Sequence, residues 1–119
     1  AKVVILGNLL MGLSLSLNDI DRVGIAQITN ADIAQAKNEN KYWKLIGKVE
    51  NTKNGYAASV KPEMVSHEHP LSSIRGATNA ITYSTELLGD ITLVGPGAGR
   101  METGFAVIED ILLIHRKNP

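Results

Sequence analysis

The sequence predicts an α+β fold with a mostly antiparallel or mixed sheet and flanking helices. Its apolar and turn-forming residues indicate, in order, a helix, a short helix, a hairpin, two further strands and a closing helix. Few of the connections are long enough for a parallel crossover, which takes a dozen or more residues. The chain has 119 residues, 44% of them hydrophobic, which is enough for a modest core.

The first predicted element is a helix over residues 1–11, where apolar side chains surround most of the helical wheel and indicate packing on several sides. The apolar run continues to Leu17, but it contains glycine and serine, has no basic lead-in, and falls short of the about 20 apolar residues that cross a membrane. We therefore expect its second part to be extended or irregular. Because Ala1 already lies inside this run, without a cap or a methionine, we expect the C-terminal part of a longer chain.

Caps, turns and alternation predict the remaining elements. Residues 29–32 offer a helix start, and this short helix ends near residues 38–40. Asn54-Gly55 is a typical hairpin turn. The elements expected after the short helix are a hairpin of strands 42–50 and 56–60, a loop over 62–70, one helical turn over 71–74, strands 77–85 and 90–94 joined by a turn over 86–89, a glycine-rich turn over 95–99, and a helix over 101–115.

Composition argues against several classes of protein. Twelve basic and twelve acidic residues give a formal net charge of zero, and no basic cluster is longer than Arg116-Lys117, so nucleic acid is not an expected partner. No membrane partner is expected either. The sequence has no cysteine, which excludes a disulfide framework, a thiolate metal site and a cysteine nucleophile from these residues. The absence of cysteine also agrees with a reducing compartment, and we expect a cytoplasmic protein.

The glycine-rich segment Gly95-Pro96-Gly97-Ala98-Gly99-Arg100 is the first candidate for a functional role. It joins a predicted strand to a predicted helix, where backbone N–H groups and the positive end of the helix dipole could meet an anion or the edge of a cofactor. The segment matches neither a phosphate-binding loop nor the dinucleotide fingerprint. On the residues alone, a plain structural turn is the more common role.

Lys2 is the second candidate, because it stands near the start of a very apolar helix. The unfavourable end of the helix dipole and partial desolvation would both lower the pKa of this lysine, as suits a general acid or base. The alternative is that its side chain extends to solvent from the end of the helix, which is the more common behaviour of such lysines.

His67 and His69 are the third candidate, because alternate residues of an extended segment point the same way and two imidazoles could share a metal ion. No third ligand follows at a recognisable spacing, so we predict no metal site. We expect instead that His69 fixes a loop through the following proline and an imidazole hydrogen bond. The sequence also lacks the motif of a serine hydrolase.

Several short motifs occur in a fixed order, and together they carry a family resemblance. They are Lys61-Pro62-Glu63-Met64-Val65, His69-Pro70-Leu71, Gly76-Ala77-Thr78-Asn79-Ala80, Gly89-Asp90, and Gly95-Pro96-Gly97-Ala98-Gly99-Arg100 followed by Thr103. From about Asp32 to the end, their order and spacing resemble the second half of homoserine dehydrogenase. The opening Ala1-Lys2-Val3-Val4-Ile5-Leu6 is similar to the end of that family's D-x-x-x-K stretch, whose aspartate lies outside this chain.

The resemblance implies an oxidoreductase that interconverts L-homoserine and L-aspartate 4-semialdehyde by hydride transfer with NAD or NADP, on the route to threonine, methionine and isoleucine. It implies that Lys2 is the catalytic lysine and that Gly99 contacts the cofactor. The choice between NAD and NADP stays open, because it depends on a domain outside this sequence.

The resemblance also implies an organisation for the chain. Residues 1–119 would be part of a substrate-binding and dimerisation domain, without the nucleotide-binding domain, in a homodimer formed through the sheet. This part alone is expected to be inactive. The alternative is a stand-alone dimerisation or ligand-binding module without catalysis.

Overall fold

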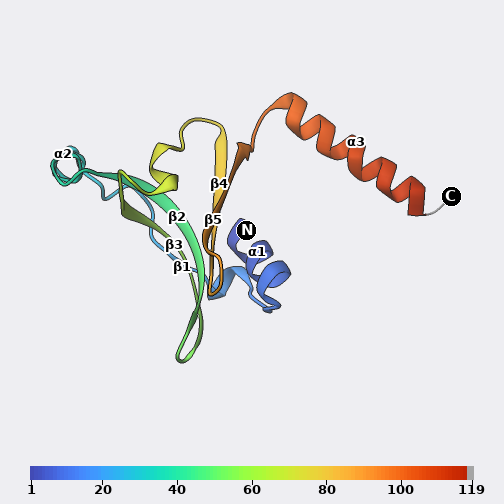
Figure 1. Cartoon of the computed structure of the whole chain (residues 1–119), viewed down its shortest axis with the longest axis horizontal. Coiled ribbons are helices and arrows are strands. Elements are labelled where there is room, and N and C mark those ends of the chain that lie inside the picture. The colour runs from blue at the N-terminus through green and yellow to red at the C-terminus, as the bar shows by residue number, and fades with distance from the viewer. Residues whose placement is uncertain (118–119) are drawn as a thin grey trace. The chain divides into compact units, whose positions relative to one another are not determined.

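A computed structural model describes residues 1–117 and confirms the α+β class (Figure 1). The elements are α1 (Lys2–Met11), the 3-10 turn η1 (Leu17–Asp19), β1 (Asp21–Arg22), α2 (Asn30–Asn38), β2 (Lys41–Thr52), β3 (Gly55–Ser66), the 3-10 turn η2 (Pro70–Ser73), β4 (Thr78–Thr85), β5 (Gly89–Pro96) and α3 (Arg100–Lys117). Contacts divide the chain into two compact units, one of residues 1–68 and one beginning at His69. Each unit is described by itself.

The first unit is built on a mixed sheet of three strands in the order β1-β3-β2. Strands β2 and β3 form the predicted hairpin, antiparallel from the pair Lys41 and Ser66 to the pair Thr52 and Gly55, and run side by side in Figure 1. Gly55 closes the turn with a φ of 113°, a conformation that glycine adopts without strain. The short strand β1 pairs with β3 in parallel, Asp21 opposite Ser59.

The predicted loop over residues 62–70 was wrong in its first part, because β3 continues to Ser66. Pro62 lies opposite Leu45 of β2 within the ladder. A proline is tolerated in a strand at an edge that no neighbour occupies. Strand β1 pairs with β3 on the side opposite to β2, and it ends at Arg22, opposite Val60. At Pro62, that side of β3 therefore has no neighbouring strand among the described residues.

Helix α1 ends where the sequence predicts, at Gly12 in the left-handed conformation that commonly closes helices. The segment after it is tied back to the helix: the side-chain amide of Asn8 donates to the carbonyl of Leu15 (3.0 Å) and accepts from the Leu15 N–H (2.7 Å). Among residues 1–117, the packing that was predicted on several sides of α1 is not found. Gly7 is the buried residue of α1, and Leu9 is 75% exposed.

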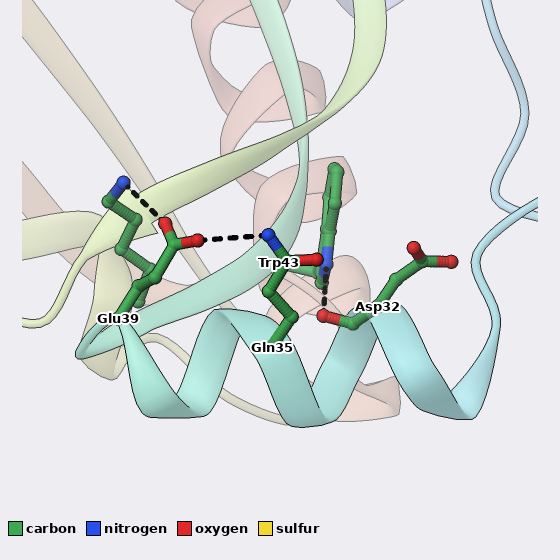
Figure 2. A network of polar contacts seen from close by, with 5 residues as sticks. Asp32, Gln35, Glu39 and Trp43 are labelled. Atoms are coloured by element: carbon green, nitrogen blue, oxygen red, sulfur yellow. Dashed lines mark hydrogen bonds and ion pairs between the residues drawn. The ribbon is translucent and has the colours of Figure 1, made fainter.

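Helix α2 begins with a capping box that fits its predicted start. The backbone N–H of Asp32 donates to the Thr29 hydroxyl oxygen (3.2 Å), and the Asp32 carboxylate accepts from the Thr29 N–H (2.8 Å) and hydroxyl (2.6 Å). The hydrogen bond with the Thr29 hydroxyl has the largest effect and that with the Thr29 N–H the second largest, and both hold the pKa of Asp32 below its ordinary value. A hydrogen bond joins β2 to α2: the indole N–H of Trp43 donates to the carbonyl of Asp32 (3.2 Å), as Figure 2 shows.

A second polar contact joins the end of α2 to the start of β2. The Glu39 carboxylate accepts from the Gln35 amide (3.0 Å) and pairs with the Lys41 ammonium (2.9 Å) (Figure 2). The hydrogen bond from Lys41, more than that from Gln35, holds the pKa of Glu39 below its ordinary value. The apolar core of the described residues is small and consists of Ile20, Ala36 and Ala58, all in the first unit.

The second unit contains the two remaining strands and the closing helix. Strands β4 and β5 are antiparallel, from Thr78 opposite Pro96 to Thr85 opposite Gly89, as predicted from their alternation. The glycine-rich turn then leads into α3, as Figure 1 shows. The predicted helical spacing on α3 is confirmed, but its apolar residues are exposed, Phe105 at 66% and Ile108 at 58%. Within residues 1–117 no helix combines the length and the apolar character needed to span a membrane.

Candidate active site

Lys2 is the first residue of α1 and follows an N-cap, Ala1, whose side chain makes no capping hydrogen bond. The carbonyl of Ala1 accepts the first helical hydrogen bond, from the N–H of Ile5 (3.0 Å). Lys2 is exposed, so the partial desolvation predicted for it is not found within this chain. Within this chain the Lys2 side chain is therefore accessible from solvent at the start of the helix.

Helix α1 is seated on β2 through two glycines, each of which faces a valine. A β-carbon on Gly47 of β2 would lie 2.6 Å from Cγ2 of Val3, the residue after Lys2. A β-carbon on Gly7 of α1 would lie 3.5 Å from Cγ2 of Val49 and 2.8 Å from the Leu15 side chain. The glycines therefore let helix and strand approach closely, as an isolated glycine in a strand often does.

The glycine-rich turn holds a defined geometry between β5 and α3. The N–H of Gly97 donates to the carbonyl of Ala77 (3.2 Å), which extends the β4–β5 pairing by one step. Gly99 has a φ of 153°, which side chains rarely adopt, and its carbonyl accepts the first hydrogen bond of α3, from the N–H of Thr103 (3.0 Å). Gly99 is thus required by the backbone, whatever lies beside it.

A shallow groove begins at Gly99 and follows the first turns of α3. It is lined by Gly99, Arg100, Thr103, Gly104, Val107 and Ile108. The carboxylate of Glu102 lies where a side chain on Gly99 would begin, so the positive end of the helix dipole already has an anion beside it. The backbone at Gly99 is therefore covered by a carboxylate, which disfavours the binding of a further anion at this helix start.

The two neighbouring histidines are engaged with protein groups. The Nδ1 of His69 accepts from the N–H of Leu71 (3.1 Å), which caps η2 and confirms the predicted loop-fixing hydrogen bond. The ring of His67 contacts the ring of Tyr42, with centroids 5.3 Å apart. No group of three or more histidine, cysteine, aspartate or glutamate residues is placed to hold a metal ion anywhere in residues 1–117.

The predicted site residues lie on different units, Lys2 on the first and Gly99 on the second. The structure also shows two residues in contact with these segments that the sequence did not single out for such a role. Gly47 supports the helix that carries Lys2, and Asn79 lies against Gly97. The signals for both were in the sequence: an isolated glycine within a strand pattern, and an asparagine in the Gly76–Ala80 motif.

Comparison with known proteins identifies the family. The model of the homoserine dehydrogenase family matches residues 1–112, a range that includes both Lys2 and Gly99. The chain therefore belongs to the homoserine dehydrogenase family. This confirms the resemblance carried by the short motifs.

Individual relatives agree. An NAD(+)-dependent homoserine dehydrogenase from Pseudomonas canavaninivorans is 47% identical over 116 residues, which cover 97% of this chain and 33% of that protein. The homoserine dehydrogenase of Bacillus subtilis is 34% identical over 113 residues, 95% of this chain and 26% of that protein. This chain thus spans a third or less of the length of these relatives.

Solved structures show the same fold. The crystal structure of S. aureus homoserine dehydrogenase at pH 6.5 matches with a TM-score of 0.86 and 36% identity, over 96% of this chain and 29% of that one. The homoserine dehydrogenase of Thiobacillus denitrificans matches with a TM-score of 0.89 and 26% identity, over 99% of this chain and 28% of that one. The arrangement of helices and strands in this chain is therefore that of part of a homoserine dehydrogenase.

Proposed function

We propose that the intact protein carrying this chain is an oxidoreductase that interconverts L-homoserine and L-aspartate 4-semialdehyde with NAD or NADP. The observation that carries this proposal is the family match over residues 1–112, which includes both Lys2 and the glycine-rich turn. The exposed Lys2 near a helix start and the lack of a side chain at Gly99 support it chemically.

Lys2 moves the proton that the reaction requires. When bound, the cofactor would supply or remove the hydride at the carbon that is an aldehyde in one direction and an alcohol in the other. In reduction, the Nζ of Lys2 gives a proton to the substrate oxygen as that oxygen gains negative charge. In oxidation, the neutral amine takes the same proton from the homoserine hydroxyl.

Gly99 and the groove along α3 hold one edge of the cofactor. Gly99 has no β-carbon, so the ligand can approach the backbone of the turn once the flexible Glu102 side chain turns aside, and the groove residue Thr103 offers a hydroxyl near the same position. The larger part of the cofactor is bound outside this chain. Both NAD and NADP remain candidates, because the residues that distinguish them belong to that other part of the protein.

The organisation we propose follows the family. Residues 1–119 form part of a substrate-binding and dimerisation domain, which is inactive alone and pairs with a second copy through the sheet. The protein acts in the cytoplasm on a small-molecule substrate, in the synthesis of threonine, methionine and isoleucine, without a nucleic-acid or membrane partner.

The test is a homoserine-dependent NAD(P) reduction assay on the intact protein and its variants. Lys2→Ala should lower kcat by about 100- to 10,000-fold, the contribution typical of a general acid or base, with little change in the KM for the cofactor. Gly99→Val should chiefly raise the KM for the cofactor. The matched controls are Lys53→Ala, at an exposed lysine in the β2–β3 turn, and Gly89→Val, at a glycine that also has a positive φ (69°) and has open space around it.

An intact protein that does not reduce either cofactor with homoserine would contradict the proposal and favour a binding module without catalysis. A reversed pattern, in which Lys2→Ala changes the cofactor KM and Gly99→Val changes kcat, would overturn the assigned roles.

A further inference from the structure

Gly47 lies in the middle of β2, where a strand residue normally carries a side chain. A β-carbon at this position would meet Cγ2 of Val3 at 2.6 Å and Cγ2 of Val60 at 3.9 Å. The first distance is shorter than real β-carbon contacts, so the valine would have to move, whereas the second is an ordinary contact. The conflict is therefore specific to the first turn of α1.

Val3 cannot easily turn its side chain away. In a helix, valine has one strongly preferred χ1 rotamer, because its branched β-carbon meets the preceding turn. A side chain on Gly47 would therefore lift the first turn of α1 off the sheet rather than rotate Val3. Lys2 is the adjacent residue of that turn and would be displaced with it.

The rest of α1 resists a shift of the whole helix. Gly7 is buried against Val49 and Leu15, and the side chain of Asn8 binds the backbone of Leu15 through two hydrogen bonds. These contacts hold the middle of the helix, so a displacement caused at Val3 falls on the N-terminal turn.

We infer that Gly47 is a positioning residue for Lys2, acting through the close contact between β2 and Val3. This inference rests on the proposed function, in which Lys2 transfers the proton. Catalytic groups must be held close to their productive geometry, and a misplacement of about 1 Å can cost about 100-fold in rate. The absence of a side chain at Gly47, which leaves room for Val3, is thus a requirement of the chemistry as well as of the packing.

The experiment compares Gly47→Ala, Val3→Ala and the double variant in the intact protein, with Lys2→Ala and Gly24→Ala beside them. Gly24 has open space around it and serves as the matched control. Gly47→Ala should lower kcat by about 10- to 100-fold while the KM for the cofactor stays unchanged. The double variant should regain most of kcat, because the shortened side chain at position 3 leaves room for the new methyl group.

Two readouts separate positioning from a loss of folded protein. The kcat values are measured below each variant's thermal midpoint, so unfolded enzyme does not contribute to the difference. The solvent deuterium isotope effect on kcat should rise in Gly47→Ala, because a displaced Lys2 makes proton transfer slower relative to the other steps. A purely structural defect would leave this isotope effect as it is in the unchanged protein.

Each outcome decides the inference. If Gly47→Ala has normal kcat while Lys2→Ala is inactive, the positioning role is wrong and the proposed function stands. If Lys2→Ala is fully active, the proposed catalytic role is wrong and the inference is lost with it. If Gly47→Ala does not fold, the comparison is between Val3→Ala and the double variant: equal kcat supports the inference, and a further large loss in the double variant overturns it.

Discussion

Replacing Gly97 by alanine would place a methyl group where the side chain of Asn79 already lies. The new β-carbon would overlap the amide nitrogen and Cγ of Asn79, and it would lie 2.7 Å from the Asn79 β-carbon. The amide group can rotate away, but a β-carbon is fixed to its own backbone. The substitution must therefore separate β4 from the glycine-rich turn.

The expected cost follows from this overlap. Overpacking that forces the backbone to shift destabilises by about 1–3 kcal/mol. The hydrogen bond from the Gly97 N–H to the Ala77 carbonyl joins the two segments that must separate, so the loss falls on that turn. Because each 1.4 kcal/mol corresponds to a tenfold change in an equilibrium constant, local opening of the turn should become about 5- to 150-fold more frequent.

Hydrogen–deuterium exchange of the intact protein measures this directly. Peptides that span the β5–α3 turn should lose protection by that factor in Gly97→Ala and keep it in Gly95→Ala, because nothing lies within 4 Å of a β-carbon at Gly95. Adding Asn79→Ala to Gly97→Ala should restore part of the protection. Unchanged exchange in Gly97→Ala would refute the reasoning, since Asn79 would then not fill the space.

Two further predictions concern α2. Trp43→Phe removes the indole donor to the Asp32 carbonyl and should cost about 1 kcal/mol of stability, seen as a lower denaturant midpoint; an unchanged midpoint would show that the bond contributes nothing. The Thr29 hydroxyl and backbone N–H hold the pKa of Asp32 below its ordinary value. The Asp32 carboxylate therefore stabilises α2 fully at a pH above the ordinary pKa, and this stabilisation is lost as the pH falls through the lower pKa of the folded protein. Asp32→Asn should remove this acid sensitivity from exchange in α2, and an identical acid profile would contradict it.

Local signals in the sequence predicted most of the elements. Thr29 and Asp32 form the cap expected of their pattern, and Asn54-Gly55 closes the hairpin, because caps and turns depend on residues a few positions apart. The same local reasoning fails at Pro62, which by itself predicts a break in the strand. Its strand is held by pairing with Leu45 on β2, and that pairing depends on the sheet rather than on its immediate neighbours.

The sequence by itself determined the order of helices and strands, the family through its ordered motifs, and Lys2 and Gly99 as candidates. Only the tertiary structure showed that Gly47 makes room for Val3 and that Asn79 lies against Gly97. The physical reason is that these contacts join residues far apart in the chain. Close packing between them is decided by how a helix meets a strand, or a strand meets a turn, and no local periodicity records it.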